Sequence, residues 1–88
     1  MLFHIIAQHD HTTCARVQNG KVLPRQPGKP MPWMDGNEHV KVVGVWGYPV
    51  EHKVFAVIES DSFEEVTKLF ESHLAIGPVE VLPVRAMS

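Results

Sequence analysis

Two histidines and the single cysteine of the chain lie within one short segment, His9-Asp10-His11-Thr12-Thr13-Cys14. Residues two apart in an extended chain point to the same side, so the imidazoles of His9 and His11 are expected roughly 6–7 Å apart on one face. Cys14 follows two threonines, which favour a turn. Imidazole and thiolate suit zinc, copper, iron or nickel as ligands and suit magnesium or calcium poorly. The segment therefore predicts a transition-metal site with His9, His11 and Cys14 as ligands.

His52 is the expected fourth ligand. If the first and third long strands are antiparallel neighbours, the end of one lies beside the start of the other, which places His52 near His9. Three protein ligands with one open position are usual for catalytic zinc, whereas structural zinc has four. Asp10 is expected to point away from the ion and to orient an imidazole from outside. In the alternative structural interpretation, the histidines are solvated in a loop and Cys14 is a small buried residue.

The same residues also fit chemistry without a metal. A histidine would then move protons, and Cys14 would act as a nucleophile beside an imidazolium. His11, Cys14 and His52 are the candidate catalytic residues in that case. His4 is expected inside a strand as a core residue with satisfied hydrogen bonds, and His73 near a helix end in a structural role; the sequence assigns no role to His39.

Composition excludes several classes of protein. The chain has 88 residues, enough for one domain, and a core this small is marginal unless the chain associates. A net charge of −2 without a basic run argues against nucleic-acid binding, and no apolar stretch approaches the ~20 residues of a membrane span. The first residues lack the basic region of a signal peptide, and one cysteine cannot form an internal disulfide. We therefore expect a cytoplasmic protein.

Hydrophobic alternation predicts four long strands and one helix. The strands are expected at residues 2–8, 40–47, 52–59 and 78–85, and the helix from Ser62 to the stop at Gly77-Pro78. Ser62 with Glu65 fits a capping box, and Phe63, Val66, Leu69, Phe70, His73 and Leu74 form one stripe. The predicted strand faces are Val40, Val42, Gly44 and Trp46 opposite Lys41, Val43 and Val45. Because both sides of the first strand carry apolar residues, it is expected to be central and covered on both sides.

Four prolines between Pro24 and Pro32 exclude a long helix from the irregular insertion at about 19–37. Asn19-Gly20 predicts a tight turn between two short hairpin arms, and Pro32 to Glu38 a single helical turn. Met31, Trp33 and Met34 are expected to close one end of the core; the alternative is a lid or a dimer-clasping arm.

This order of elements predicts an α+β, ferredoxin-like domain over residues 1–88. The four-stranded antiparallel sheet has its first and third long strands at the centre, and the Pro-rich crossover stands in place of a full first helix. One helix covers only one face of such a sheet. We therefore expect a homodimer that stacks two sheets face to face and buries the other face.

The chain also resembles the dimeric α+β barrel superfamily. Its opening, Met1-Leu2-Phe3-His4-Ile5, is similar to the start of muconolactone isomerases, and residues 40–46, 52–61 and 77–84 resemble small uncharacterised members. His11-Thr12-Thr13-Cys14 resembles a His-Thr-x-x-x-Cys segment of some of them, with two residues fewer between His and Cys. The superfamily includes isomerases, cofactor-independent monooxygenases and haem enzymes, so this fold admits several functions.

The sequence thus predicts a small dimeric metal-binding protein. One alternative is a metal-free, isomerase- or monooxygenase-like enzyme with a small-molecule ligand in the barrel cavity. The other is a non-catalytic accessory module whose Pro-rich arm docks on a partner.

Overall fold

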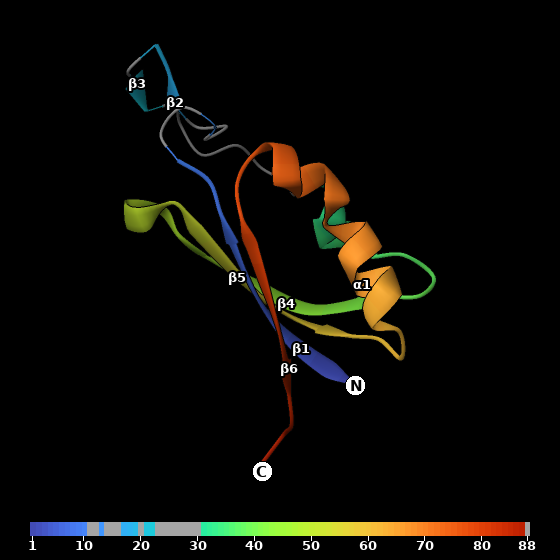
Figure 1. Ribbon diagram of the computed structural model, residues 1–88. Coiled ribbons are helices and arrows are strands. Elements are labelled where there is room, and N and C mark those ends of the chain that lie inside the picture. Colours follow the sequence, from blue (N-terminus) through green and yellow to red (C-terminus); the bar gives the residue numbers. More distant parts are fainter. Residues whose placement is uncertain (11–12, 14–16, 20, 23–30, 88) are drawn as a thin grey trace.

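The computed structural model describes residues 1–10, 13, 17–19, 21–22 and 31–87. Its elements, shown in Figure 1, are β1 (Leu2–Gln8), β2 (Val17–Gln18), β3 (Lys21–Val22), the 3-10 helix η1 (Pro32–Asp35), β4 (Lys41–Tyr48), the 3-10 helix η2 (Pro49–Glu51), β5 (Lys53–Glu59), α1 (Phe63–Leu69), the 3-10 helix η3 (Glu71–Ala75) and β6 (Val79–Val84).

The four long strands form one antiparallel sheet in the order β4-β5-β1-β6. This is the ferredoxin-like order, and it confirms the prediction that the first and third long strands are central. Pro83 lies in β6 at the edge of the sheet, where the missing N–H of a proline is tolerated. The predicted hairpin at Asn19 is also present, as β2 paired with β3 and with Asn19 in a left-handed conformation (φ 52°).

One face of the sheet carries the hydrophobic core, beneath α1 and η3 (Figure 1). Alternate residues of β1 and β5 point into it, so Phe3, Ile5 and Ala7 are fully buried. Trp33 from η1 packs against Phe70 with ring centroids 4.8 Å apart and is only 1% exposed. The prediction that the segment at Trp33 closes the core is therefore confirmed. The predicted helical turn that begins at Pro32 is present as η1.

The predicted helix divides into two parts. Ser62 caps α1 by accepting a hydrogen bond from the Glu65 backbone N–H (3.2 Å), as expected, but the chain narrows to the 3-10 helix η3 after Leu69. The predicted stripe is correct for Val66, Phe70 and His73, whereas Phe63 and Leu74 are exposed. The tighter 3-10 turn changes which residues share a face, so Leu74 leaves the predicted stripe while His73 stays in the core.

A β-bulge at Val43 corrects the predicted faces of β4. Val42 pairs with Ile58 and Gly44 pairs with Val57, so one residue is inserted between two consecutive pairs. Beyond the bulge the alternation is shifted by one. Trp46 therefore lies on the opposite face from Val42 and is 57% exposed, and Val45 faces the core instead.

The second face of the sheet is open in the single chain. That a second copy of the chain covers β1 on this side stays a prediction. The central positions of this face are His4, Ile6, Phe55, Val57, Trp46 and Leu82, which neighbour one another through the strand register. The side chains from β1 and β5 are half-buried, and Trp46 and Leu82 are exposed.

Candidate functional site

His9 and His52 meet where β1 ends and β5 begins. The backbone N–H of His9 donates to the carbonyl oxygen of His52 (3.1 Å), and the ring centroids are 5.1 Å apart in an edge-to-face arrangement. His52 does not start the strand as predicted. It ends η2 in a left-handed conformation (φ 55°, ψ 45°), which turns the chain sharply into β5. The antiparallel pairing of β1 with β5 thus brings two of the four predicted ligands together.

Both imidazoles have a nitrogen that lacks a hydrogen-bond partner. Within the described part of the chain, the Nδ1 atoms of His9, His52 and His73 are buried and unpaired. Leaving a buried polar atom unpaired costs about 1–3 kcal/mol, so such atoms are uncommon in folded proteins. Three of them gather at one end of the sheet, and the Nε1 of Trp33 in the core is likewise buried and unpaired.

The environment of His9 favours its neutral form. Burial lowers its pKa below the ordinary value of 6.5, the neighbouring rings of His52 and His73 lower it further, and Asp10 opposes them. A neutral imidazole has the free lone pair that metal coordination or proton abstraction needs. His9 is therefore prepared to act as a ligand or a base at neutral pH.

We expect the metal-free protein to become less stable as the pH falls below 6.5, because His9 of the unfolded chain binds a proton near this value. The folded chain binds that proton only at lower pH, so protonation favours unfolding in between. Urea unfolding between pH 7.5 and 5.5 in the presence of a chelator measures the effect. His9→Gln should flatten the pH dependence and His39→Gln should not; equal slopes for wild type and His9→Gln would refute the prediction.

Asp10 shapes a turn directly after His9. Its backbone N–H donates to Thr13 Oγ1 (2.9 Å), and the Thr13 N–H lies 3.1 Å both from the carbonyl oxygen and from Oδ1 of Asp10. The turn expected from the threonines is therefore present. The carboxylate of Asp10 contributes to it; that Asp10 orients an imidazole from outside the ion stays a prediction.

His11 and Cys14, the other predicted ligands, lie outside the described residues. Among the residues that are described, no group of three or more His, Cys, Asp or Glu side chains is arranged to hold a metal ion. His9 and His52 by themselves are therefore two nitrogen donors and not a metal site. Whether His11 and Cys14 complete it stays a prediction.

The remaining histidines differ in their surroundings. His4 stacks on Phe55 across the open face of the sheet (centroids 6.3 Å apart), and His39 is exposed beside Glu38. His73, for which the sequence predicted a structural role, is only 1% exposed, and its Nε2 lies 2.9 Å from the carbonyl oxygen of Gln8, the residue before His9. Helical spacing alone gave no sign that His73 reaches the end of β1.

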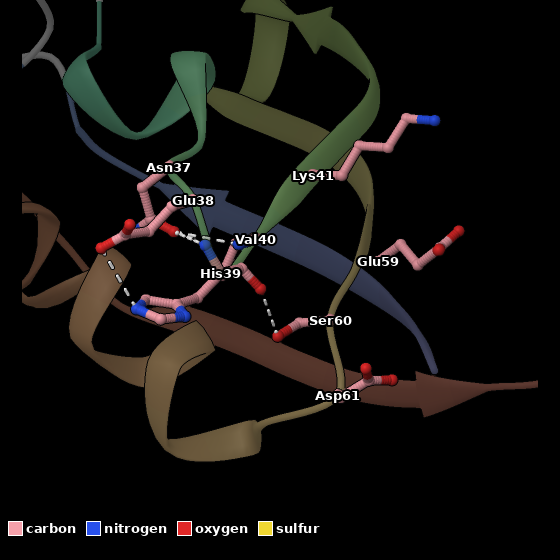
Figure 2. A pocket seen from close by; sticks show the side chains of 8 residues that line it. All are labelled: Asn37, Glu38, His39, Val40, Lys41, Glu59, Ser60 and Asp61. Carbon is pink, nitrogen blue, oxygen red and sulfur yellow. Dashed lines mark hydrogen bonds and ion pairs between the residues drawn. The ribbon is translucent and has the colours of Figure 1, made fainter.

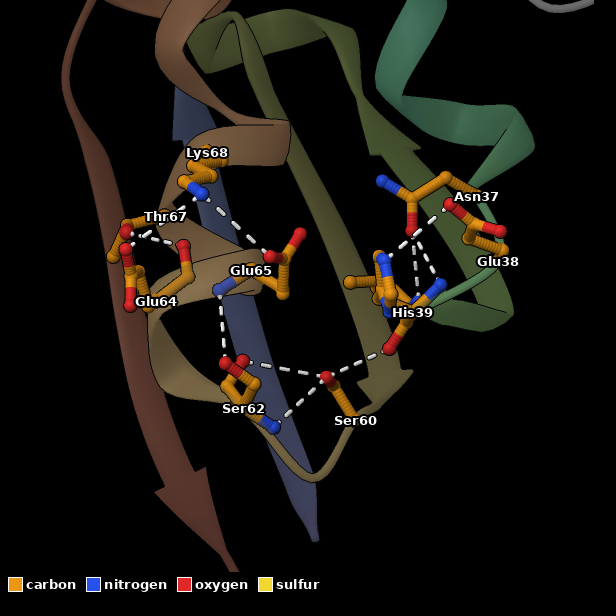
Figure 3. Close-up of polar contacts among 10 residues, drawn as sticks. Asn37, Glu38, His39, Ser60, Ser62, Glu64, Glu65, Thr67 and Lys68 are labelled. Carbon is orange, nitrogen blue, oxygen red and sulfur yellow. Dashed lines mark hydrogen bonds and ion pairs between the residues drawn. The ribbon is translucent and has the colours of Figure 1, made fainter.

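A polar pocket lies at the other end of the sheet from His9 and His52, at the start of β4 and the end of β5, and His39 lines it (Figure 2). Several of its polar groups are hydrogen-bonded to one another or to the start of α1. The Ser60 hydroxyl donates to the His39 carbonyl oxygen (2.8 Å) and accepts from the Ser62 N–H (3.1 Å), as Figure 3 shows. The Asn37 side-chain oxygen accepts from the backbone of His39 and Val40. These contacts join the start of α1 to the sheet, so we interpret the pocket as structural.

The fold and the histidine pair define a small α+β protein with ferredoxin-like strand order and a polar site at one end of its sheet. The chain belongs to the family described as "Domain of unknown function (DUF3303)", whose model matches residues 1–88. No significant match was found among curated proteins or solved structures. The resemblance to muconolactone isomerases therefore gains no support from these comparisons and contributes no residue below. In the part of the chain that the structure describes, no helix has the length and apolar character needed to cross a bilayer.

Proposed function

We propose that this protein binds a transition-metal ion through His9 and His52, with His11 and Cys14 as the further ligands. The contact between the two imidazole rings, 5.1 Å apart with both Nδ1 atoms buried and unpaired, carries the proposal. At this spacing, a nitrogen of each imidazole could be directed at one ion. A metal would satisfy both nitrogens, and the burial of His9 favours the neutral form that coordination requires.

The donor set decides which ions fit. Imidazole with thiolate suits zinc, copper, iron or nickel, and all four side chains together would form a closed, tetrahedral zinc-type site. If one of them stays outside the coordination sphere, an open position remains for a substrate or water, as in catalytic zinc. A reducing cytoplasm, which we propose as the compartment, would keep Cys14 available as a thiol.

The first test is the metal content of freshly purified, tag-free protein, measured by mass spectrometry. We expect near-stoichiometric zinc, copper, iron or nickel in the wild type, and its loss in both His11→Ala and Cys14→Ala. His39→Ala is the matched control, because His39 is an exposed histidine at the start of β4, far from the site. If both variants keep the metal content of the wild type, or if the wild type holds none, the proposal fails.

Acid–base chemistry without a metal is a second candidate, supported by the lowered pKa of His9. Neutral His9 would accept a proton, and Cys14 would be the nucleophile. Fast alkylation of Cys14 at neutral pH in metal-free protein, slowed in His9→Gln and unaffected in His39→Gln, would favour this function. Slow alkylation in all three proteins would count against it.

We also propose that the open sheet face binds a second copy of this chain. Its central positions are apolar except for His4, and its charges are balanced in sign: Lys41 lies opposite Glu59 in the strand register at one end, and Lys53 and Glu80 lie toward the other. Such a face can be complementary to itself about a two-fold axis. Burying it would also enlarge the small core of an 88-residue chain.

Trp46→Glu is expected to convert this dimer into monomers, because it places an unpaired charge at the centre of the buried face. Breaking a buried contact in this way costs about 3–5 kcal/mol, which weakens association at least about 100-fold. Light scattering coupled to size exclusion measures the mass. Val50→Glu is the control, since Val50 is 78% exposed in η2 rather than in the sheet. A dimer that persists in Trp46→Glu would exclude this face as the interface.

A further inference from the structure

We propose that His73 is the positioning residue of the histidine site: it donates the hydrogen bond to the end of β1 that Pro78 is unable to donate, and thereby holds His9 in place. The inference rests on the proposed function, in which His9 is a ligand. His73 itself does not touch the ion in this arrangement. It acts through the backbone of Gln8.

The pairing of β1 with β6 shows why a donor is missing. Ala7 is opposite Val79, so the next pair is Gln8 with Pro78, and the Gln8 N–H indeed donates to the Pro78 carbonyl oxygen (2.9 Å). In an antiparallel ladder such a pair exchanges two hydrogen bonds. Pro78 has no N–H, so the return bond to the Gln8 carbonyl oxygen is absent.

The imidazole of His73 supplies that bond from outside the sheet. Its Nε2 lies 2.9 Å from the Gln8 carbonyl oxygen, and because a carbonyl only accepts, Nε2 is the donor. His73 comes from η3, which directly precedes β6 in the chain and lies above the end of β1 in Figure 1. The side chain of His73, four residues before Gly77, thus satisfies the carbonyl oxygen of Gln8.

Gly77 gives the Gln8 carbonyl the room to be reached. A Cβ built on Gly77 would lie 2.0 Å from the Gln8 oxygen and 3.2 Å from the His9 Cα. Three residues therefore act on one peptide group. His73 supplies the hydrogen-bond donor, Gly77 has no Cβ that would clash, and Pro78 has no N–H that would compete for the carbonyl. That peptide group is the one that joins Gln8 to His9.

The consequence for His9 is a backbone fixed from both sides. Its own N–H is held by the His52 carbonyl oxygen (3.1 Å), and the carbonyl that precedes it is held by His73. The ring of His73 is also near enough to lower the pKa of His9. Packing alone does not require histidine at this position, because a buried leucine would fill the space without leaving the Nδ1 of His73 unpaired.

The test compares His73→Met with His73→Gln. The two side chains have the same length, and only glutamine can donate a hydrogen bond to Gln8. The first readout is the ring ¹⁵N and ¹H NMR signals of His9 in metal-free protein. The second is the affinity for Co²⁺, followed by its visible absorption. Pro78→Ala, which restores the missing backbone N–H, is combined with His73→Met as a rescue, and His39→Gln is the control.

We expect His73→Met to shift the His9 signals and to weaken Co²⁺ binding about 10–100-fold, as loss of a group that orients a ligand typically does. His73→Gln and the His73→Met/Pro78→Ala double variant should lie near the wild type in both. The inference is overturned if methionine and glutamine leave the His9 signals alike and change only the melting temperature. If His73→Met does not fold alone, it is compared in the Pro78→Ala background, where displaced His9 signals would contradict a role as donor.

The two proposals fail separately. Absence of Co²⁺ binding by the wild type would refute the metal site, and the NMR signals of His9 would still decide the role of His73. Conversely, full Co²⁺ affinity and unchanged His9 signals in His73→Met would leave the metal site intact and remove the positioning role.

Discussion

His52→Asn is expected to weaken metal binding by about 100-fold or more while leaving the fold in place. Apparent binding free energies of structural zinc sites are about 10–16 kcal/mol for four ligands, or about 3 kcal/mol for each, which corresponds to about 100-fold in affinity. Asparagine is preferable to alanine here because His52 has a left-handed backbone (φ 55°), which asparagine tolerates well. Competition with a chromophoric chelator gives the affinity.

The control for this variant is His39→Asn, which removes an exposed imidazole from the opposite end of β4. In metal-free protein, His39→Asn should unfold in urea within about 0.5 kcal/mol of the wild type, as surface substitutions usually do, and His52→Asn should remain folded. Equal metal affinity for His52→Asn and the wild type would show that the contact between His9 and His52 serves the fold alone. A site made only of His9, His11 and Cys14 would then be the remaining metal hypothesis.

Most of the fold could be predicted because its signals are local. Alternation in β1 and β5, the serine cap at Ser62 and the turn at Asn19 each depend on a few neighbouring residues, and all are present. The bulge at Val43 could not be predicted from alternation, since the inserted residue is itself apolar and lies among other apolar residues of the strand. Only the pairing with β5 shows that Trp46 faces away from Val42.

Only the part of the candidate site that follows from strand order could be predicted from the sequence. His9 and His52 could be paired from the sequence because antiparallel neighbours place the end of the first long strand beside the start of the third. His73 was assigned a structural role because helical spacing describes a face and not the atom that a side chain contacts. Its bond to Gln8 depends on the register of β1 with β6, through which Pro78 faces Gln8.

Gly77→Ala tests that register most directly, and it is expected to destabilise the protein by about 3 kcal/mol. The added Cβ would lie 2.0 Å from the Gln8 oxygen and 2.8 Å from the Gln8 carbonyl carbon, and these are backbone atoms of the central strand. Overpacking of this kind costs about 1–3 kcal/mol even where side chains can move aside, and a paired strand has less freedom. Urea unfolding measures the loss.

Gly47→Ala is the matched control, because a Cβ on Gly47 in β4 would meet nothing within 4 Å. Its stability should stay within about 1 kcal/mol of the wild type, since replacing a strand glycine changes mainly backbone entropy. If Gly77→Ala lowers the stability no more than Gly47→Ala does, the close approach of residue 77 to the Gln8 carbonyl is contradicted. If Gly77→Ala is destabilised as expected, the NMR signals of the His9 ring should also shift. The new methyl group would displace the Gln8 carbonyl, and this is the carbonyl that accepts the hydrogen bond from His73.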